Sequence, residues 1–372
     1  MVIRNIGFKI DTDSWTCGST IPFGLRMLPS IIEINLLEVL IHVAKRTSFP
    51  ISYGFTLSDL WAWLRYFPAF SNDINLRLRA EWDEVDSHQK TILSDDMGMG
   101  FSSAILSYCL DLVWICPTSY VVRRHPNISL RRSGKKGPDK SPDFMAVDMF
   151  DNIHVFECKG TQSDIKTLDK QLNTGIEQKN NLLDPNGLID QKLVTGVFIP
   201  QYNSNEFALF KIKDPEFSLD FSSVKKDEII ETIILGEIAS FLHLLGFPKI
   251  ANSIAENKKL DIENIEKSQR EVNELDTEII NGKKYKIINR IHRIDYPDDF
   301  SDQGLYGIKI QMGIRSDFIN KLLLYYKSPI EIVREFRFEL QNKDLNKNNT
   351  KRGKNWASIE SPLGTFVKLE LI

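Results

Sequence analysis

Two acidic side chains and a lysine stand near the middle of the chain, where one turn can bring them together. Asp143 precedes an apolar segment at 144–149, and Glu157 and Lys159 end a second segment that begins at Ile153. Carboxylate oxygens are preferred ligands of hard divalent cations, and an ammonium group stabilises developing negative charge. These residue types therefore suit a site that holds a divalent cation and a positioned water.

A β-hairpin is expected to position these side chains. Both apolar segments are rich in residues that suit a pleated strand, and the two residues at 151–152 favour a tight turn. Because side chains alternate along a strand, Glu157 and Lys159 project from one face and Cys158 from the other. The turn folds Asp143 back towards the pair, so two carboxylates and one amine converge at an edge of the sheet.

The spacing resembles that of the PD-(D/E)xK nucleases, the restriction-endonuclease-like superfamily, through Pro142, Asp143, Glu157 and Lys159. The resemblance implies an Mg²⁺-dependent phosphodiesterase, with Mn²⁺ as an alternative metal. It implies that Asp143 and Glu157 bind the metal, together with the backbone carbonyl of Cys158. It gives Lys159 the role of orienting or activating the attacking water, or of stabilising the transition state.

The same resemblance implies an α/β fold in which a mixed central sheet is flanked by helices. We expect this nuclease core at 94–213, preceded by a mainly helical region at 1–93 and followed by an α+β recognition or interaction domain at 214–372. The predicted core elements are a helix from residue 94, strands at 112–116, 120–124, 144–149, 153–159, 193–200 and 207–212, and a helix at 165–183.

The helix predicted from Ser94 is a source of a further acid. In the resembled superfamily this helix often supplies one to the metal site, and Asp96 occupies a matching place, with Asp95 as the less favoured choice. The family more often uses glutamate there, so a helix-start acid without a catalytic part is the competing interpretation. Gly98 and Gly100 are poor helix formers and indicate that the backbone of this helix closely approaches another group.

Two glutamines on the next predicted helix are auxiliary candidates. Gln171 and Gln178 are seven residues apart and therefore share a helical face. Several families of the superfamily carry a glutamine on this helix near the active site. The alternative is that both are ordinary exposed side chains. His154 shares the strand face of Cys158 and is expected to be a core or interface histidine.

A basic run leads up to the first acid of the motif. Its central cations are predicted to grip the phosphate backbone of DNA, with RNA as the alternative substrate and a plain solvated loop as the competing interpretation. These cations are Arg131, Arg132, Lys135 and Lys136.

Neutralising Arg131 and Arg132 to alanine should weaken DNA binding and make it less dependent on salt. Each lost phosphate contact should reduce the slope of log affinity against log salt by roughly one. Fluorescence anisotropy at several salt concentrations measures both effects, and unchanged binding throughout the series would contradict a role for these cations.

The composition sets the broad class of protein. The 372 residues are 42% hydrophobic and 26% charged, with a net charge of −3, as expected of a soluble globular chain with no overall nucleic-acid signature. Four scattered cysteines show no zinc spacing and fit a reducing cytoplasm. The start of the chain has no signal-peptide core, and the apolar run at 31–44 is too short and too polar to span a bilayer.

These features together predict a metal-dependent DNA endonuclease, in the setting of restriction or antiphage defence if the protein is microbial. No phosphate-binding loop, dinucleotide fingerprint or serine or zinc hydrolase motif supports another chemistry. Three alternatives stay open. The fold could bind nucleic acid or a partner without cutting, a partner subunit or homodimer could switch cleavage on, or the hairpin charges could simply be solvated.

Overall fold

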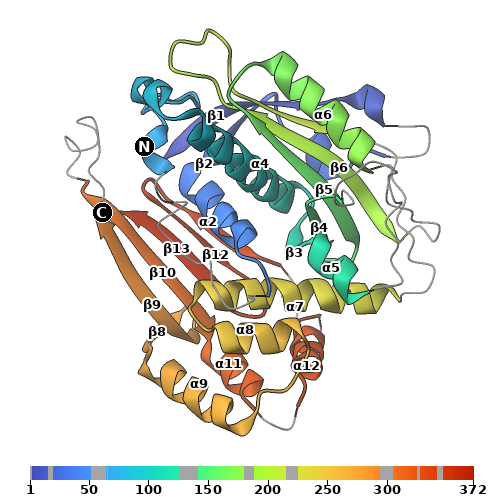
Figure 1. Cartoon of the computed structure of the whole chain (residues 1–372), viewed down its shortest axis with the longest axis vertical. Coiled ribbons are helices and arrows are strands. Elements are labelled where there is room, and N and C mark those ends of the chain that lie inside the picture. Colours follow the sequence, from blue (N-terminus) through green and yellow to red (C-terminus); the bar gives the residue numbers. More distant parts are fainter. Residues whose placement is uncertain are drawn as a thin grey trace.

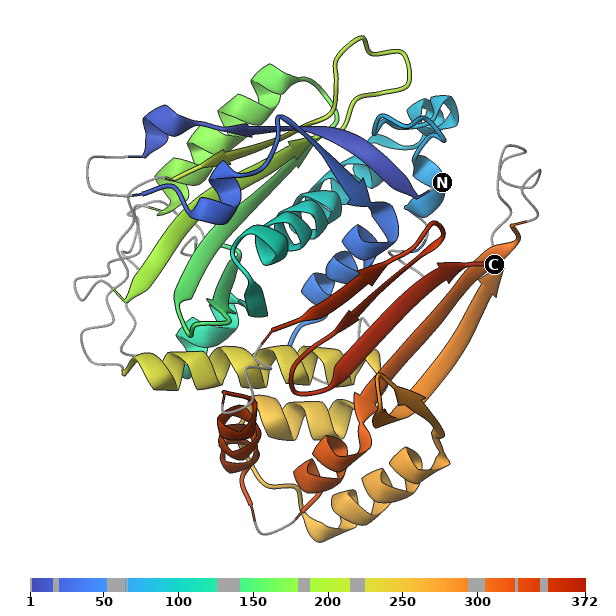
Figure 2. The same ribbon diagram turned by 180° about the vertical axis from the view of Figure 1, so that it is seen from behind.

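The computed structural model describes residues 2–15, 20–51, 64, 66–125, 141–179, 188–214, 225–293, 305–324, 327–341 and 347–372. Its elements stack in layers (Figures 1 and 2). Helix α6 (Ile165–Lys179) covers one face of a seven-stranded sheet, α4 (Ser87–Cys109) covers the other, and α2 (Leu36–Thr47) packs between α4 and a second sheet. The protein is thus of the α/β class, with a mixed sheet flanked by helices, as the sequence predicts.

The first sheet has the strand order β2-β1-β7-β6-β5-β4-β3. The pairs β1–β7 and β5–β6 are parallel and the other neighbours are antiparallel. Its strands are β1 (Ile3–Ile10), β2 (Ile31–Asn35), β3 (Leu112–Pro117), β4 (Phe144–Asp148), β5 (Ile153–Thr161), β6 (Ile189–Phe198) and β7 (Leu209–Lys213).

The predicted hairpin is confirmed. Strands β4 and β5 pair from Val147–Ile153 to Phe144–Phe156, and Asp151 in the turn has the left-handed φ of 65° that the sequence indicated. The carboxylate of Asp148 accepts hydrogen bonds from two backbone N–H groups of the turn. The hairpin is therefore fixed at its turn as well as along its ladder.

The N-terminal region differs from the mainly helical prediction. Strands β1 and β2 complete the edge of the first sheet, so the apolar run at 31–44 is a strand followed by a helix. Asn35 divides the two, because its side chain accepts a hydrogen bond of 2.9 Å from the N–H of Leu37 and caps α2. A short helix, α1 (Phe23–Arg26), contacts α4.

Two further elements depart from the predictions. Helix α4 starts at Ser87, seven residues before the predicted start, because Asp86 caps it by accepting from the N–H of His88. The segment predicted as a strand at 120–124 is helix α5 (Thr118–Arg124). Tertiary contacts decide this second case, since the hydroxyl of Tyr120 is buried and donates to the carbonyl of Ala255.

The C-terminal region forms helices and an antiparallel sheet with the order β11-β12-β13-β10-β9-β8. Its inner face packs on α2. Its strands are β8 (Asp276–Ile280), β9 (Lys283–Arg293), β10 (Gly307–Arg315), β11 (Asn349–Arg352), β12 (Trp356–Glu360) and β13 (Thr365–Leu371), and its helices are α7 (Lys226–Leu244), α8 (Pro248–Ala255), α9 (Ile262–Glu274), α11 (Ser316–Leu322) and α12 (Pro329–Gln341).

Buried charges join the regions that the sequence analysis treated as separate. Glu237 on α7 is buried, lies 2.5 Å from the ammonium of Lys45 on α2, and accepts a hydrogen bond from the N–H of Ile115 on β3. A buried carboxylate needs such partners because its charge is otherwise poorly solvated. The proposed boundary at 93/94 also falls within α4. In the ranges described above, no helix is long and apolar enough to cross a membrane.

Candidate functional site

The three side chains of the predicted motif meet where β4 begins. The backbone N–H of Asp143 donates to Oε2 of Glu157 at 3.0 Å, and Nζ of Lys159 donates to Oε1 of the same carboxylate at 2.6 Å. The N–H of Cys158 donates to Oδ2 of Asp143 at 2.7 Å. Asp143, Glu157 and Lys159 therefore form one connected cluster.

Pro142 explains why a ladder hydrogen bond between the β4 side and β5 is missing at this point. The ladder between β4 and β5 ends at Phe144–Phe156, and two further residues would place Pro142 opposite Cys158. Proline has no N–H, so it gives no ladder hydrogen bond to the carbonyl of Cys158. The N–H of Cys158 is taken by the Asp143 carboxylate instead. This leaves a main-chain oxygen at the same edge of β5 as the two acids.

The acids are held under electrostatic strain. Burial and the negative charge of Glu157 raise the pKa of Asp143 to about 7, against the opposing effects of the Cys158 N–H and of Lys159. Near neutral pH this carboxyl group is therefore only partly ionised. The arrangement favours binding of a cation, because added positive charge would relieve the repulsion between the two acids.

Lys159 is a fixed cation at neutral pH. Burial alone would lower the pKa of its ammonium, but the charges of Glu157 and Asp143 outweigh burial and raise that pKa above its usual value. A lysine whose pKa is raised is a poor general base. The geometry therefore favours stabilisation of negative charge over abstraction of a proton.

Helix α4 is pressed against the end of β5 through two glycines. A Cβ atom added to Gly160 would lie 1.8 Å from the carbonyl oxygen of Ser94, and one added to Gly98 would lie 2.8 Å from the carbonyl carbon of Lys159. Gly100 makes a similar approach to α2. The close backbone approach expected from these helix glycines is confirmed, and at Gly98 it is made to the backbone of Lys159.

The helix phase separates the two candidate acids of α4. At 100° per residue, Asp95 lies about 60° around the helix from Gly98, whereas Asp96 lies about 160° from it. Lys159 acts on the pKa of Asp95, which burial nevertheless raises above its usual value. Asp95 is exposed and Asp96 is half-buried. The helix phase thus turns Asp95 nearer than Asp96 to the backbone of Lys159.

Helix α6 covers the acids from the opposite face. A Cβ atom added to Gly175 would lie 3.6 Å from Cγ of Glu157, and Gln171 lies one turn earlier on the same side. The amide oxygen of Gln171 is buried and has no hydrogen-bond partner in the part of the chain that the structure describes. The backbone of Gln178 is in α6, but its side chain lies outside that part.

The four predicted nucleic-acid-binding cations also lie outside the described residues; they are Arg131, Arg132, Lys135 and Lys136. His154 is a core residue as predicted, 2% exposed and 3.1 Å from the Asp148 carboxylate.

Sequence reasoning missed Gln162, which fixes the start of α4. Its side-chain amide donates to the carbonyl of Lys90 at 2.7 Å and to the hydroxyl of Ser94 at 3.0 Å. Its amide oxygen accepts from the indole N–H of Trp82. The only sequence signal was its place, three residues after Lys159 at a strand end.

A comparison with models of protein families, with curated proteins and with solved structures finds no match to this chain. The assignment of a function therefore depends on the site itself.

A metal ion at this site would have to be held by side-chain and main-chain oxygens together. Among the described residues, no group of three or more His, Cys, Asp or Glu side chains is arranged to hold a metal ion. Asp143 and Glu157 supply two carboxylates, and the carbonyl of Cys158 supplies a main-chain oxygen at the same edge. Such an all-oxygen set, completed by water, fits Mg²⁺ or Mn²⁺.

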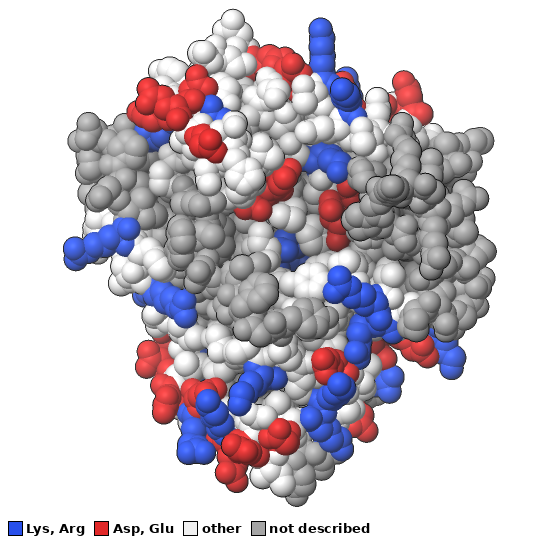
Figure 3. Space-filling model, in the orientation of Figure 1, with Lys and Arg blue, Asp and Glu red and all other residues white. Residues whose placement is uncertain are grey.

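The described surface carries both signs of charge. On the face seen in Figure 3, acidic and basic side chains are interspersed. This fits the net charge of −3 and means that the attraction of a nucleic acid must come from local groups.

Proposed function

We propose that the chain is a metal-dependent endonuclease that hydrolyses phosphodiester bonds of DNA. The observation that carries the proposal is the direct contact of Asp143, Glu157 and Lys159 at the end of the β4–β5 ladder. Two acids beside a protonated lysine suit a reaction in which a phosphate is bound and gains negative charge. Restriction or antiphage defence in a cytoplasm is the proposed setting.

The fold gives further support. The order α4-β3-α5-β4-β5-α6-β6-β7 includes a helix before the hairpin, α4, and one after it, α6, which lie on opposite faces of the sheet. That is the arrangement expected of a restriction-endonuclease-like core around residues 94–213. Strands β1 and β2 would then be additions to the far edge of this core.

Asp143, Glu157 and the Cys158 carbonyl would hold Mg²⁺ or Mn²⁺. When bound, such an ion neutralises charge on the scissile phosphate and lowers the pKa of a water. The raised pKa of Asp143 supports this assignment, because a carboxylate destabilised by its neighbour gains most from a cation.

Lys159 would stabilise the transition state directly. Its ammonium is kept protonated by Glu157, and its stem lies over Gly196, where an added Cβ atom would be 3.4 Å from Cβ of the lysine. In the proposed reaction this ammonium would donate to a phosphoryl oxygen that gains charge. Asp95, across from Lys159, would hold this ammonium or a metal-bound water in place.

Incubation of the purified chain with supercoiled plasmid and Mg²⁺ tests the proposal. We expect nicking or linearisation that is lost in EDTA and lost in the Glu157→Gln variant. Binding of plasmid without cleavage in Mg²⁺ and in Mn²⁺ would favour the alternative function, that of a subunit that binds nucleic acid without cutting it. Cleavage that persists in the Glu157→Gln variant would exclude this site.

Asp95 and Asp96 offer a matched pair of variants. Asp95→Asn should slow cleavage by roughly 10- to 100-fold, because it removes a carboxylate that interacts electrostatically with Lys159. Asp96→Asn should change the rate less than about threefold, since the helix phase turns this residue away from Gly98 and Lys159. Initial rates of plasmid nicking measure both. A larger loss in Asp96→Asn would restore the original sequence-based preference.

A further inference from the structure

The edge strand β2 leaves backbone hydrogen-bonding groups open. Asn5 on β1 lies opposite Glu33. The N–H of Asn5 donates to the carbonyl of Ile74, and its own carbonyl accepts from Leu76, so both groups of Asn5 face away from β2. Asn5 and Glu33 are therefore a pair without mutual hydrogen bonds in the antiparallel ladder, and the N–H and C=O groups of Glu33 point outwards. By the same alternation, those of Ile31 point outwards too.

The other edge of this sheet is closed by side chains. The side-chain amide of Asn348 donates to the carbonyls of Leu112 and Val113 on β3. Glu237 accepts from the N–H of Ile115 on the same strand. Proteins commonly protect edge strands in this way, because unpaired backbone groups attract further strands. In the part of the chain that the structure describes, no side chain covers the edge of β2 in the same manner.

A groove of about 300 Å³ lies between the edge of β2 and α4. All but the last residue of β2 line it, and α4 contributes Ala104, Ile105 and Tyr108. Figure 2 shows the blue strand that leads into α2 with the teal helix α4 beneath it. Ile31 and Tyr108 are 53% and 66% exposed, so apolar surface is accessible along the groove. A strand added to β2 would therefore rest on α4.

The groove carries one unpaired charge. Glu38 is buried and accepts a hydrogen bond of 2.9 Å from Arg352. Glu33 is exposed and has no hydrogen-bond or ion-pair partner among the residues that the structure describes. A residue opposite Glu33 on an added strand would point to the same face, with the two Cβ atoms about 5 Å apart. A basic side chain is favoured at that position.

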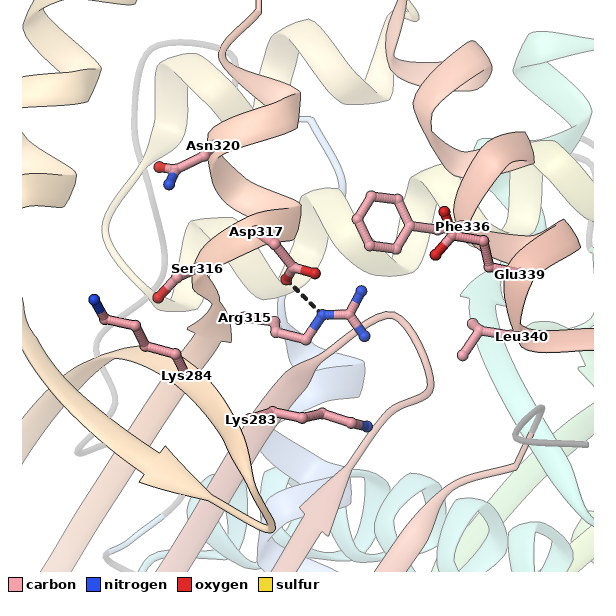
Figure 4. A pocket seen from close by; sticks show the side chains of 9 residues that line it. All are labelled: Lys283, Lys284, Arg315, Ser316, Asp317, Asn320, Phe336, Glu339 and Leu340. Carbon is pink, nitrogen blue, oxygen red and sulfur yellow. Dashed lines mark hydrogen bonds and ion pairs between the residues drawn. The ribbon is translucent and has the colours of Figure 1, made fainter. Parts of the chain in front are cut away.

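The larger cavity of the C-terminal region has no such imbalance (Figure 4). Its volume is about 550 Å³, and Arg315 is paired with Asp317 at 2.6 Å in its lining. Lys283, which also lines it, lies 3.4 Å from the carboxylate of Glu360. The cavity thus presents paired charges, whereas the groove beside β2 presents an unpaired acid and open backbone groups.

We propose that this groove binds an extended peptide segment of a partner protein, which adds a strand to β2. Ile32 and Ile34 are less exposed than Ile31 and Glu33, because side chains alternate between the two faces of the sheet. Peptide side chains opposite the first pair would face α4 and be apolar. The peptide residue opposite Glu33 would be lysine or arginine.

The size of the surface favours a peptide over a second copy of this chain. A stable dimer buries roughly 1,200–2,000 Å² in total. The strand β2 has five residues, and the groove beside it holds only a few side chains. One short strand fills this space, and the backbone of β2 supplies its hydrogen bonds.

Fluorescence anisotropy of the full chain with a labelled octapeptide of alternating valine and lysine tests the proposal. We expect a Kd of about 10–300 μM, and at least tenfold weaker binding when glutamate replaces the lysines. N-methylation of the peptide backbone at all lysines, or at all valines, blocks one edge of the peptide, so one methylated peptide should bind and the other should not. Absence of saturable binding up to about 1 mM protein, or equal behaviour of the two methylated peptides, would overturn the proposal.

Charge reversal locates the binding site. Glu33→Lys should weaken binding of the valine–lysine peptide at least tenfold and favour the valine–glutamate peptide. Asp276→Lys makes the same kind of change at an exposed acid on β8, the edge strand of the second sheet, and should leave both affinities unchanged. Equal effects of the two variants would mean that the peptide binds through overall charge, which would contradict a site at β2.

Two further measurements separate strand addition from folding and from self-association. Ile31→Pro removes an outward N–H, so binding should weaken severalfold while thermal unfolding stays close to wild type; a folded variant with wild-type affinity would count against strand addition. Sedimentation velocity of the chain alone tests the other occupant. A dimer that Glu33→Lys dissociates would assign the edge to a second copy and overturn the peptide proposal. Because no experiment here measures cleavage, the result is independent of the proposed nuclease activity.

Discussion

Replacing Lys159 by methionine is expected to slow phosphodiester cleavage by roughly 10³-fold. Methionine keeps the apolar stem that lies over Gly196 but removes the ammonium that, under the proposed function, would face the scissile phosphate. The lysine is held protonated by Glu157, so the lost interaction is electrostatic stabilisation and not proton transfer. Single-turnover cleavage of a plasmid at saturating Mg²⁺ measures the loss without interference from product release.

Lys170→Met is the matched control for this variant. Lys170 is exposed on α6, the helix that covers the site, so the same substitution there should leave the rate within about twofold of wild type. The pH dependence of the cleavage rate provides a second test. Because Lys159 is a fixed cation, its loss should lower the rate by a similar factor at every pH from 6 to 8. Recovery of activity in Lys159→Met at high pH would point to a proton-transfer role instead.

The site could be predicted from sequence because it depends on local geometry. Side chains alternate along any strand, so Glu157 and Lys159 had to share a face once 153–159 was identified as a strand. The turn at 151–152 fixed the return of Asp143. The resulting contacts are those in the structure. Pro142 contributes through its missing N–H, a property that is also readable from sequence alone.

The acid on α4 could not be chosen in the same way. A helix turns 100° per residue, so the choice between Asp95 and Asp96 changes the direction of the candidate carboxylate by that angle. The phase is set by Gly98, which approaches the backbone of Lys159. The spacing of three residues from Asp95 to Gly98 was a usable signal, but its meaning required knowing what the glycine contacts.

Tertiary contacts decided the elements that the sequence misassigned. The apolar run at 31–44 has the same character throughout, and only the cap at Asn35 separates the strand from the helix. The segment at 120–124 contains β-branched residues that favour a strand locally, yet Tyr120 anchors it as a helix against α8. The partner of Tyr120 is far away in the sequence, so the helix at 118–124 could not be read from local pattern, whereas the Asn35 cap is a local signal.

Replacing Asp143 by asparagine is expected to stabilise the metal-free protein while abolishing its activity. The pKa of Asp143 is about 7 in the folded chain against an ordinary value of 3.8, so between these pH values the folded chain holds a proton that the unfolded chain has released. The free energy of unfolding therefore falls as pH rises through this window, by up to about 4 kcal/mol in total. Asparagine removes this loss and can still accept from the N–H of Cys158.

Urea unfolding at pH 5, 6, 7 and 8 in EDTA measures the effect. The stability advantage of Asp143→Asn over wild type should be smallest at pH 5 and reach its full value by pH 8. Asp276→Asn, which neutralises an exposed acid on β8, should show no such trend. A variant less stable than wild type at pH 8 would mean that the Asp143 carboxylate is not held unfavourably by burial and by Glu157.

Mg²⁺ is expected to reverse the order of stability of wild type and Asp143→Asn. Mg²⁺ should raise the stability of wild type with increasing concentration, because binding to the folded state alone adds RT ln(1 + [L]/Kd), and it should leave Asp143→Asn nearly unchanged. Since the ion displaces the proton of Asp143, apparent Mg²⁺ affinity in wild type should increase from pH 5 to about pH 7 and then level off. The electrostatic strain that weakens the empty site is thus the same property that makes it bind a cation, and one substitution should remove both.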